Sequence, residues 1–385
     1  MFEAGAQLSP EEKSRYARQI SLPEVGVEGQ QRLKAASVLC IGAGGLGSPL
    51  LLYLSAAGVG RIGIVDDDLV ELSNLQRQVV HGIGTVGQAK TSSARSRIED
   101  LNSFCRVEEH CFRFSANNAL DLIGSYDVVV DGTDNFASRY LISDACVLMK
   151  RPFVYGSVQR FEGQVSVFNV GINSPDFRDL MPEPPPQGLV PSCADGGVMG
   201  VMPGLIGLIQ AAEVIKLITG IGTPLDGRLL LVDGLSMRFR EFNLKRRPSR
   251  AQIKKLIDYQ AFCMAGGSIS GKELKVVKSI SVVELKTLMD LDNDLALIDV
   301  RNPSEAEVAV IAGSVLIPLA GIESGESMEQ IRAIAGSRTI YLHCKLGGRS
   351  AKAVALLEAD GISAINVEGG IDAWSQEIDP SVARY

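Results

Sequence analysis

The stretch ASVLCIGAGGLGSPLLLYLSAAG, residues 36–58, decides the fold of the first half of the chain. It reads as a short buried strand, a turn rich in glycine and a helix that ends at Gly58. Gly42, Gly44 and Gly47 have the spacing of a dinucleotide-binding fingerprint, in which the backbone approaches a ligand and the helix N-terminus attracts an anion. The stretch therefore predicts a nucleotide site. Taken alone, it favours a nicotinamide or flavin enzyme.

The alternation of strand and helix signals continues beyond this stretch. Buried apolar runs at 59–68 and 126–135 alternate with helical patterns at 89–102 and 138–151. Strands that alternate with helices form right-handed βαβ units, so we predict an α/β fold with a parallel, Rossmann-like sheet. Two further alternating runs then predict an antiparallel hairpin around Glu162–Gly163.

A second α/β pattern begins after a basic and irregular stretch. A chain of 385 residues exceeds the size at which one hydrophobic core keeps growing, which favours two domains. We predict a first domain over residues 1–245, a linker over 246–278, and a smaller α/β domain over 279–385.

The composition limits the compartment and the partners. The net charge of -7 argues against nucleic acid as a partner. The seven cysteines are scattered and include no Cys-x-x-Cys pair, and the first residues have no apolar segment typical of a signal peptide. A reducing cytoplasm is expected. The most apolar segment, 198–220, carries polar residues in its second half and is predicted to be a buried helix, with no membrane contact.

Polar residues downstream of the glycine turn differ from those of a dehydrogenase. Asp66 ends the second strand, where a carboxylate can hold the hydroxyls of a ribose. Asn74 and Arg77 follow in SNLQRQ, and Lys90 lies in GQAK. The two cations can neutralise a triphosphate and stabilise charge that develops at its α-phosphate. Asp134, after a further strand, is placed to hold Mg²⁺ beside nucleotide phosphates. Together these residues fit nucleotidyl transfer.

Five motifs occur in the order typical of one family: RYARQI, GAGGLGSPL, IVDDDLVELSNLQRQ, GQAK and DGTDN. They resemble the ThiF/MoeB adenylyltransferases, relatives of ubiquitin-activating enzymes, over residues 10–245. The resemblance implies ATP with Mg²⁺, the metal held by Asp134, and catalysis by Arg77 and Asp134. It implies that ATP is bound by Gly44, Gly45, Asp66, Asn74, Arg77, Lys90, Asp134 and Asn135. It also implies a homodimer in which Arg18 reaches the other subunit's site.

The segment HCKLGGRS, residues 343–350, follows a predicted strand and opens a helix. Cys344 there would meet backbone N–H donors and the positive end of the helix, which stabilise a thiolate or a persulfide. We interpret His343 as a packing residue rather than a general base. LIDVRNPSEAEVAVIAGSVLIPL and VEGGIDAW resemble rhodanese, which implies that Cys344 carries the persulfide. The persulfide loop would comprise Cys344, Lys345, Gly347, Gly348 and Arg349.

The fusion resembles the bifunctional adenylyltransferase–sulfurtransferases of the MoeZ and MOCS type. The resemblance implies a ubiquitin-like, β-grasp sulfur-carrier protein ending in Gly-Gly, whose C-terminal glycine is adenylated and then converted to a thiocarboxylate. The sulfur donor would be a cysteine desulfurase or thiosulfate. MPEPPPQGLVPSCADGG, residues 181–197, carries Cys193 on a proline-rich loop. Cys193 would be the second thiol, which either forms an intermediate thioester or resolves an acyl-disulfide. A small residue buried before a helix is the alternative.

The sequence departs from the family at its structural zinc site, which normally consists of two Cys-x-x-Cys pairs. Asp176 and Asp179 stand where the first pair is expected, and KRRPSRAQIKK contains no cysteine where the second is expected. Two aspartates without further ligands are a poor zinc site, so we expect no zinc. The strap bearing Cys193 is then either more mobile or held by packing from the basic segment.

Two other functions are less compatible with these motifs. A nicotinamide-dependent oxidoreductase is disfavoured by SNLQRQ and Lys90, and a non-catalytic scaffold that binds a carrier is disfavoured by the candidate residues at both sites. The pathway served stays open among molybdopterin, thiamine, tRNA thiolation, cysteine and siderophore synthesis.

Overall fold

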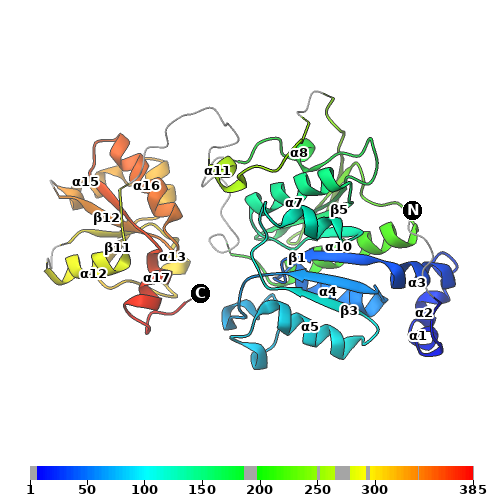
Figure 1. Ribbon diagram of the computed structural model, residues 1–385. Coiled ribbons are helices and arrows are strands. Elements are labelled where there is room, and N and C mark those ends of the chain that lie inside the picture. The colour runs from blue at the N-terminus through cyan, green and yellow to red at the C-terminus, as the bar shows by residue number, and fades with distance from the viewer. Residues whose placement is uncertain are drawn as a thin grey trace. The chain divides into compact units, whose positions relative to one another are not determined.

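The chain forms two compact units, Met1–Ile269 and Ser270–Tyr385, in a computed structural model (Figure 1). The structure describes residues 7–185, 197–248, 252–264, 278–291, 295–336 and 338–384. Cys193 lies outside these ranges, so what the sequence implies for it stays a prediction. Each unit is described by itself.

The first unit is built on a sheet of eight strands in the order β3-β2-β1-β4-β5-β6-β7-β8. The strands are β1 (Ser37–Ile41), β2 (Arg61–Val65), β3 (Arg106–His110), β4 (Val128–Asp131), β5 (Phe153–Gln159), β6 (Glu162–Phe168), β7 (Arg228–Asp233) and β8 (Arg238–Asn243). In this spatial order, each neighbouring pair from β3 through β2, β1 and β4 to β5 is parallel. Each neighbouring pair from β5 to β8 is antiparallel. The predicted Rossmann-like sheet with an antiparallel extension is confirmed.

Helices cover both faces of this sheet, and each face has its own hydrophobic core. The helices are α1 (Pro10–Arg15), α2 (Ala17–Ile20), α3 (Gly26–Ala35), α4 (Gly47–Ala57), α5 (Lys90–Leu101), α6 (Ala119–Gly124), α7 (Phe136–Met149), α8 (Phe177–Leu180), α10 (Val201–Thr219) and α11 (Tyr259–Met264). One core joins the sheet to α3, α4, α5 and α10, and the other joins it to α6, α7, α8 and α11.

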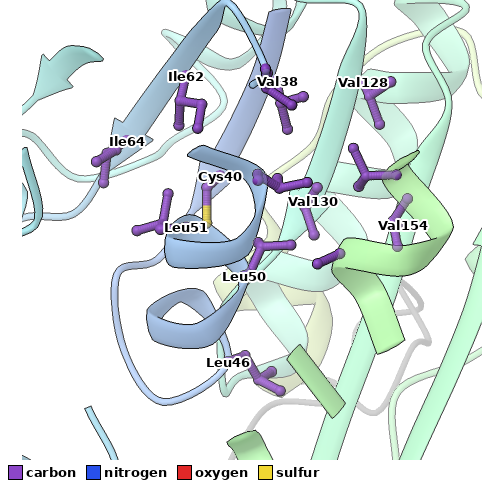
Figure 2. Packing of buried hydrophobic residues seen from close by; sticks show 14 of the residues in the cluster. Val38, Cys40, Leu46, Leu50, Leu51, Ile62, Ile64, Val128, Val130 and Val154 are labelled. Atoms are coloured by element: carbon purple, nitrogen blue, oxygen red, sulfur yellow. The ribbon is translucent and has the colours of Figure 1, made fainter. Parts of the chain in front are cut away.

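The turn between β1 and α4 is fixed by close backbone contacts. Gly42 has φ of +98°, and a Cβ there would lie 2.6 Å from the carbonyl oxygen of Gly132. A Cβ on Gly47 would lie 2.2 Å from the carbonyl oxygen of Gly42. Behind the turn, Leu50 and Leu51 of α4 pack with apolar side chains of the neighbouring strands (Figure 2). The glycines thus let the helix begin directly above the carboxyl end of the central strand.

The hairpin forms two residues earlier than the sequence predicts. Strand β5 ends at Gln159, which pairs with Glu162, so the turn consists of Arg160 and Phe161. Arg160 has φ of +53°, a left-handed conformation that favours glycine. An arginine at this position gives no sequence signal for such a turn. Glu162 and Gly163 therefore belong to β6.

The apolar segment forms α10, as predicted. By length and composition alone this helix could cross a membrane, but half of its apolar window is buried inside the unit. It packs against α4 and against strands β5 and β6. The side chains of Gln210 and Glu213 are buried and hydrogen-bonded, Gln210 to the carbonyl oxygen of Asp131 and Glu213 to the amide of Leu225. These two polar side chains of α10 are thus buried in the core with hydrogen-bond partners.

Part of the predicted linker packs onto the first unit. The amide of Arg247 donates to Oδ1 of Asp179 at 2.9 Å, and its guanidinium donates to the carbonyl oxygen of Arg178. Helix α11 packs on α7, where Tyr259 and Phe262 join the hydrophobic core. The basic segment thus packs on α8, directly before the strap; Cys193 lies outside the described residues, so the choice between a mobile and a packed strap stays a prediction.

The second unit has a parallel sheet of five strands in the order β11-β10-β12-β13-β9. Its elements are β9 (Ser279–Ile280), α12 (Val282–Leu291), β10 (Leu297–Asp299), α13 (Pro303–Ala306), β11 (Ser314–Leu316), α14 (Leu319–Glu323), α15 (Met328–Ala335), β12 (Ile340–His343), α16 (Gly348–Ala359), β13 (Ala364–Val367) and α17 (Gly370–Glu377). The strand predicted before HCKLGGRS is present as β12. Sequence reasoning missed β9 and β11, which are too short to show periodicity.

Candidate active sites in the two units

A cavity of about 1430 Å³ opens at the carboxyl ends of β1, β2 and β4 in the first unit. This is the edge at which nucleotides bind in sheets of this kind. The predicted residues that line it are Gly44, Gly45, Asp66, Arg77, Lys90, Asp134 and Asn135. Residues far apart in sequence are thus gathered at one cavity because the strands that carry them are neighbours in the sheet.

Asp66 ties the glycine turn to the end of β2. Its Oδ2 accepts from the amide of Ala43 at 2.8 Å, and its Oδ1 accepts from the amide of Asp68 at 2.9 Å. Burial raises the pKa of this carboxyl above its ordinary value. The carboxylate is therefore held at the cavity wall by two backbone donors.

Two cations lie on one side of the cavity. Lys90, the first residue of α5, is buried, and its Nζ pairs with Oδ2 of Asp68 at 2.7 Å. Arg77 donates to the carbonyl oxygen of Ser73 at 3.3 Å. Asn74 does not line the cavity; its Oδ1 accepts from the amide of Glu71 and closes the short 3₁₀ turn before Arg77. Two positive groups near a glycine turn suit a polyphosphate.

The other predicted residues of this site have different surroundings. Asp134 is exposed at the cavity. Asn135 caps α7, with its Oδ1 accepting from the amide of Ser138 at 2.9 Å. Arg18 lies on α2, is exposed, and does not line the cavity of its own chain.

Sequence reasoning missed several residues of the cavity. Arg139 lines the cavity and forms a buried ion pair with Asp131, with 3.4 Å between Arg139 Nε and Asp131 Oδ2; burial raises the pKa of Asp131 to about 6. Gln78 lines the cavity with a buried side chain whose Oε1 has no hydrogen-bond partner among the described residues. Gln78 directly follows Arg77 in SNLQRQ, and this position beside a predicted site residue is the sequence signal that could have identified it. Residues 256–260 and Cys263, from the predicted linker, also line the cavity.

The second site is the loop between β12 and α16. The Sγ atom of Cys344 accepts from the amide of Gly347 at 3.1 Å and lies 3.5 Å from Oγ of Ser350. Gly347 precedes the first turn of α16 with φ of +97°. The sulfur is thus held against the N-terminal end of a 12-residue helix, where negative charge is stabilised.

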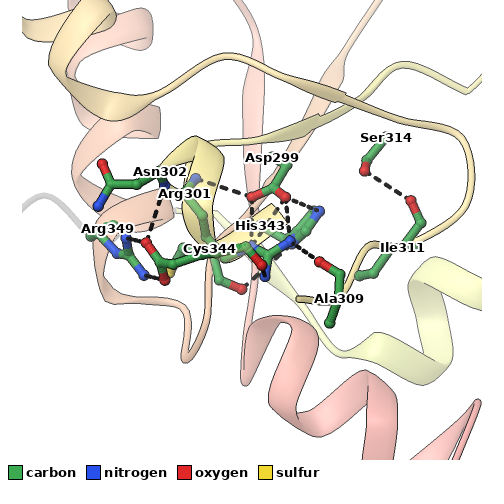
Figure 3. Close-up of polar contacts among 10 residues, drawn as sticks. Asp299, Arg301, Asn302, Ala309, Ile311, Ser314, His343, Cys344 and Arg349 are labelled. Carbon is green, nitrogen blue, oxygen red and sulfur yellow. Dashed lines mark hydrogen bonds and ion pairs between the residues drawn. The ribbon is translucent and has the colours of Figure 1, made fainter. Parts of the chain in front are cut away.

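The charged residue of this loop is paired with a neighbouring helix. Arg349 makes a bidentate ion pair with Glu305, at 2.7 and 2.8 Å (Figure 3). Oε2 of Glu305 also accepts from the amide of Asn302, which caps α13. A backbone amide and a hydroxyl group therefore donate to the sulfur, and the ion pair of Arg349 with Glu305 connects the loop to α13.

A buried ion pair lies behind the cysteine. Asp299 and Arg301 are fully buried, with Arg301 Nε 2.9 Å from Asp299 Oδ1 (Figure 3). His343 is also fully buried, and burial lowers its pKa to about 4. The imidazole is neutral at physiological pH and is enclosed by the core, which agrees with its interpretation as a packing residue.

The residues expected at the family's zinc site are engaged otherwise. Oδ1 of Asp176 accepts from the amide of Arg178 and caps α8, while Oδ2 of Asp179 accepts from the amide of Asp176. Oδ1 of Asp179 accepts from the amide of Arg247. These carboxylates bind backbone donors, and no cysteine or histidine lies at 172–182 or among the described residues of 244–258. The residues do not fit a tetrahedral zinc site.

Comparisons with known proteins follow the same division of the chain. Residues 16–253 match the ThiF family, and residues 281–377 match the rhodanese-like domain. The solved structure of PaaA is 27% identical, with a TM-score of 0.53 over 62% of this chain and 76% of that one. Escherichia coli MccB, solved with MccA, is 20% identical with a TM-score of 0.55 over 62% of this chain and 74% of that one, and shares the fold.

Two curated relatives extend over both units. The probable adenylyltransferase/sulfurtransferase MoeZ of Mycobacterium tuberculosis is 47% identical over 394 residues, which cover 100% of this chain and 98% of the relative. The adenylyltransferase and sulfurtransferase MOCS3 of Sus scrofa is 42% identical, covering 99% of this chain and 89% of the relative. The chain therefore belongs to the ThiF family, carries a rhodanese-like domain behind it, and is an adenylyltransferase and sulfurtransferase.

Proposed function

We propose that this enzyme adenylates the C-terminal glycine of a small ubiquitin-like carrier protein and then transfers sulfur to it, giving a thiocarboxylate. The observation that carries the proposal is the pairing, in one chain, of a cavity lined by a glycine turn, Asp66, Arg77 and Lys90 with a cysteine at a helix N-terminus. SNLQRQ and Lys90 disfavour an oxidoreductase, and the candidate residues at both sites disfavour a non-catalytic scaffold.

In the first step the carrier's terminal carboxylate attacks the α-phosphorus of ATP, and pyrophosphate leaves. Asp66 holds the ribose, and the amides of the glycine turn face the phosphates. Lys90 exchanges its partner Asp68 for a phosphate oxygen, and together with Arg77 it stabilises the charge that develops in the transition state. Asp134, exposed at the cavity, would hold Mg²⁺ against the phosphates.

In the second step the terminal sulfur of a Cys344 persulfide attacks the activated carbonyl carbon, and AMP leaves. The amide of Gly347 and the N-terminal end of α16 stabilise the sulfur anion before attack. The product is an acyl-disulfide on Cys344. Attack by Cys193 on the Cys344 sulfur would release the thiocarboxylate and leave a Cys193–Cys344 disulfide, which a cellular thiol reduces. Alternatively, Cys193 first takes the acyl group as a thioester.

The proposal includes the partners and the metal content. The sulfur donor is a cysteine desulfurase or thiosulfate, and the enzyme acts in the cytoplasm as a homodimer in which Arg18 completes the cavity of the partner subunit. We propose that the enzyme holds no structural zinc, because Asp176 and Asp179 bind backbone amides.

The test is pyrophosphate exchange into ATP, measured with candidate Gly-Gly carriers. Exchange should require a carrier and should be lost in Lys90→Ala, while Cys344→Ser should keep exchange and lose thiocarboxylate formation. Carrier-independent exchange, or thiocarboxylate formed by Cys344→Ser, would contradict the proposal. A pull-down with Cys193→Ala, followed by mass spectrometry of the trapped partner, identifies the carrier and with it the pathway.

A further inference from the structure

One wall of the nucleotide cavity is formed by residues that follow the last strand of the sheet. Leu256–Gln260 and Cys263 line it, although they follow the last strand of the sheet, β8. These residues form the turn before α11 and the helix itself, and we call them the linker wall. Asp258 begins the helix, because its Oδ1 accepts from the amides of Gln260 and Ala261. The wall is therefore an ordered structure with its own cap.

A buried polar network anchors the linker wall to α7. The hydroxyl of Tyr259, which is 5% exposed, donates to Oδ2 of Asp144 at 2.7 Å. Arg178 holds the same carboxylate through Nε at 2.8 Å and Nη2 at 2.7 Å. The Arg178 guanidinium also lies over the ring of Phe262, 4.9 Å from its centroid. Three charged or hydroxyl groups from three separate segments thus fix the position of α11.

The two sides of the cavity differ in chemistry. Lys90 and Arg77 lie on the side of α5 and the glycine turn, where phosphates are expected. On the other side, Phe114 and Phe136 belong to the same apolar cluster as the linker wall. Arg139, on this side, is paired with Asp131. A flat, largely apolar base prefers such apolar walls, with a few polar groups to orient it.

We propose that the linker wall, Leu256–Cys263, holds the base of ATP, and that Tyr259 is the residue that positions this wall. The inference rests on the proposed function, since it assigns one side of the same cavity. It means that occupancy of the cavity stabilises residues 256–263, the described part of the predicted linker that lines it.

Nucleotide affinity in the full-length protein tests the proposal, with ATP and inorganic tripolyphosphate as the two probes. Gln260 is exposed at the cavity, and Gln252 is exposed on the same segment outside it, so Gln260→Ala and Gln252→Ala are a matched pair. Gln260→Ala and Tyr259→Phe should each raise the Kd for ATP about threefold or more, because a hydrogen bond to the base or to its anchor is lost. The Kd for tripolyphosphate should not change, and Gln252→Ala should leave both values unchanged.

Other results would overturn the inference. An unchanged Kd for ATP in both variants, or equal loss of ATP and tripolyphosphate affinity, would place the wall away from the base. Lys90→Ala separates this from the proposed function, because it should weaken both probes. ATP binding that is insensitive to Lys90→Ala would count against the nucleotide site itself.

Hydrogen–deuterium exchange of the unaltered enzyme gives an independent measurement. ATP should slow exchange of the amides in 256–263 more than tripolyphosphate does, because only ATP carries the base. Equal protection by the two probes, or none, would contradict the role of the linker wall even if ATP binds tightly.

Discussion

Gly347 controls the backbone donor that faces the sulfur of Cys344. Its φ of +97° lies in the left-handed region, and a Cβ would come within 3.3 Å of the amide nitrogen of Gly369. Gly348, the next residue, has no atom within 4 Å of its Cβ position and no positive φ. Two adjacent glycines thus differ in what an added methyl group would do.

We predict that Gly347→Ala destabilises the second unit by about 1–2 kcal/mol, the cost of a left-handed conformation for an L-residue. The variant should also lose persulfide loading, because the amide that binds the sulfur moves. Gly348→Ala should change neither property. Denaturation followed by Trp374 fluorescence and mass spectrometry of the persulfide are the measurements. Equal effects of the two substitutions would contradict the prediction.

His343 gives the second unit a pH-dependent stability. The chain has three histidines, and His343 is the one that lies in this unit. Burial lowers its pKa to about 4, whereas an unfolded histidine titrates near its ordinary value of about 6.5. Between these values the unfolded state binds the additional proton, so stability is complete above the unfolded pKa and is lost as the pH falls toward the folded pKa.

We predict that the unit loses about 1.4 kcal/mol of stability between about pH 7.5 and pH 5.5. Trp374 is the one tryptophan of the chain and is buried in this unit, so its fluorescence reports this unfolding selectively in the intact protein. In His343→Gln the dependence in this pH range should disappear. A slope that persists in the variant would assign it to another group.

At the scale of elements, helix α8 and the segment after β8 are joined by carboxylates. Asp179 accepts from the amides of Asp176 and Arg247, which lie 3 and 68 residues away in sequence. These bonds connect α8, which precedes the strap, with the basic segment, and the resemblance predicts a metal for this connection elsewhere in the family. In this protein, hydrogen bonds within the chain connect α8 to the segment after β8; we call these bonds the fastening of α8.

We predict that Asp179→Ala lowers the stability of the first unit by about 1–3 kcal/mol, because two amide donors lose their acceptor. Asp121→Ala, at an exposed position of α6, is the control and should have little effect. A chelator should not lower the melting temperature of the unaltered protein. One zinc per chain in the denatured protein, measured by mass spectrometry, would contradict this view of the fastening.

The elements also show where sequence patterns were sufficient. Strands β1, β2 and β4 are short, apolar and flanked by glycine or aspartate, and all were predicted. The hairpin turn was misplaced because Arg160 adopts a positive φ that only its surroundings enforce. Strand β9 has two residues and β11 has three, and they are recognised as strands only because β9 pairs with β13 and β11 pairs with β10. Local signals identify an element only when it is long enough to have a period.

At the scale of the molecule, the two units have separate hydrophobic cores. The core of the second unit is assembled from β9–β13 and the helices between them. We therefore predict that residues 278–384, produced alone, fold cooperatively and transfer sulfur from thiosulfate to cyanide. The Trp374 unfolding transition should match that of the full chain within about 1 kcal/mol, the size of an ordinary single-site effect. Failure to fold would show that the first unit supplies part of the stability.

The sequence by itself determined the architecture and the positions of the main chemical groups. Glycine spacing, the alternation of strands and helices, and the SNLQRQ, GQAK and HCKLGGRS motifs are local patterns, and each follows from the backbone that its own residues require. Gly44, Asp66, Lys90 and Arg77 meet in one cavity because parallel strands end at one edge.

The tertiary structure alone decided the contacts between distant segments. Tyr259 and Asp144 are 115 residues apart, Arg247 and Asp179 are 68 apart, and Arg349 and Glu305 are 44 apart. No periodicity or motif marks these pairs, because a hydrogen bond between distant residues depends on how whole elements pack, and many charged side chains could have formed one. The linker wall at the nucleotide cavity and the fastening of α8 could therefore be recognised only after the chain had folded.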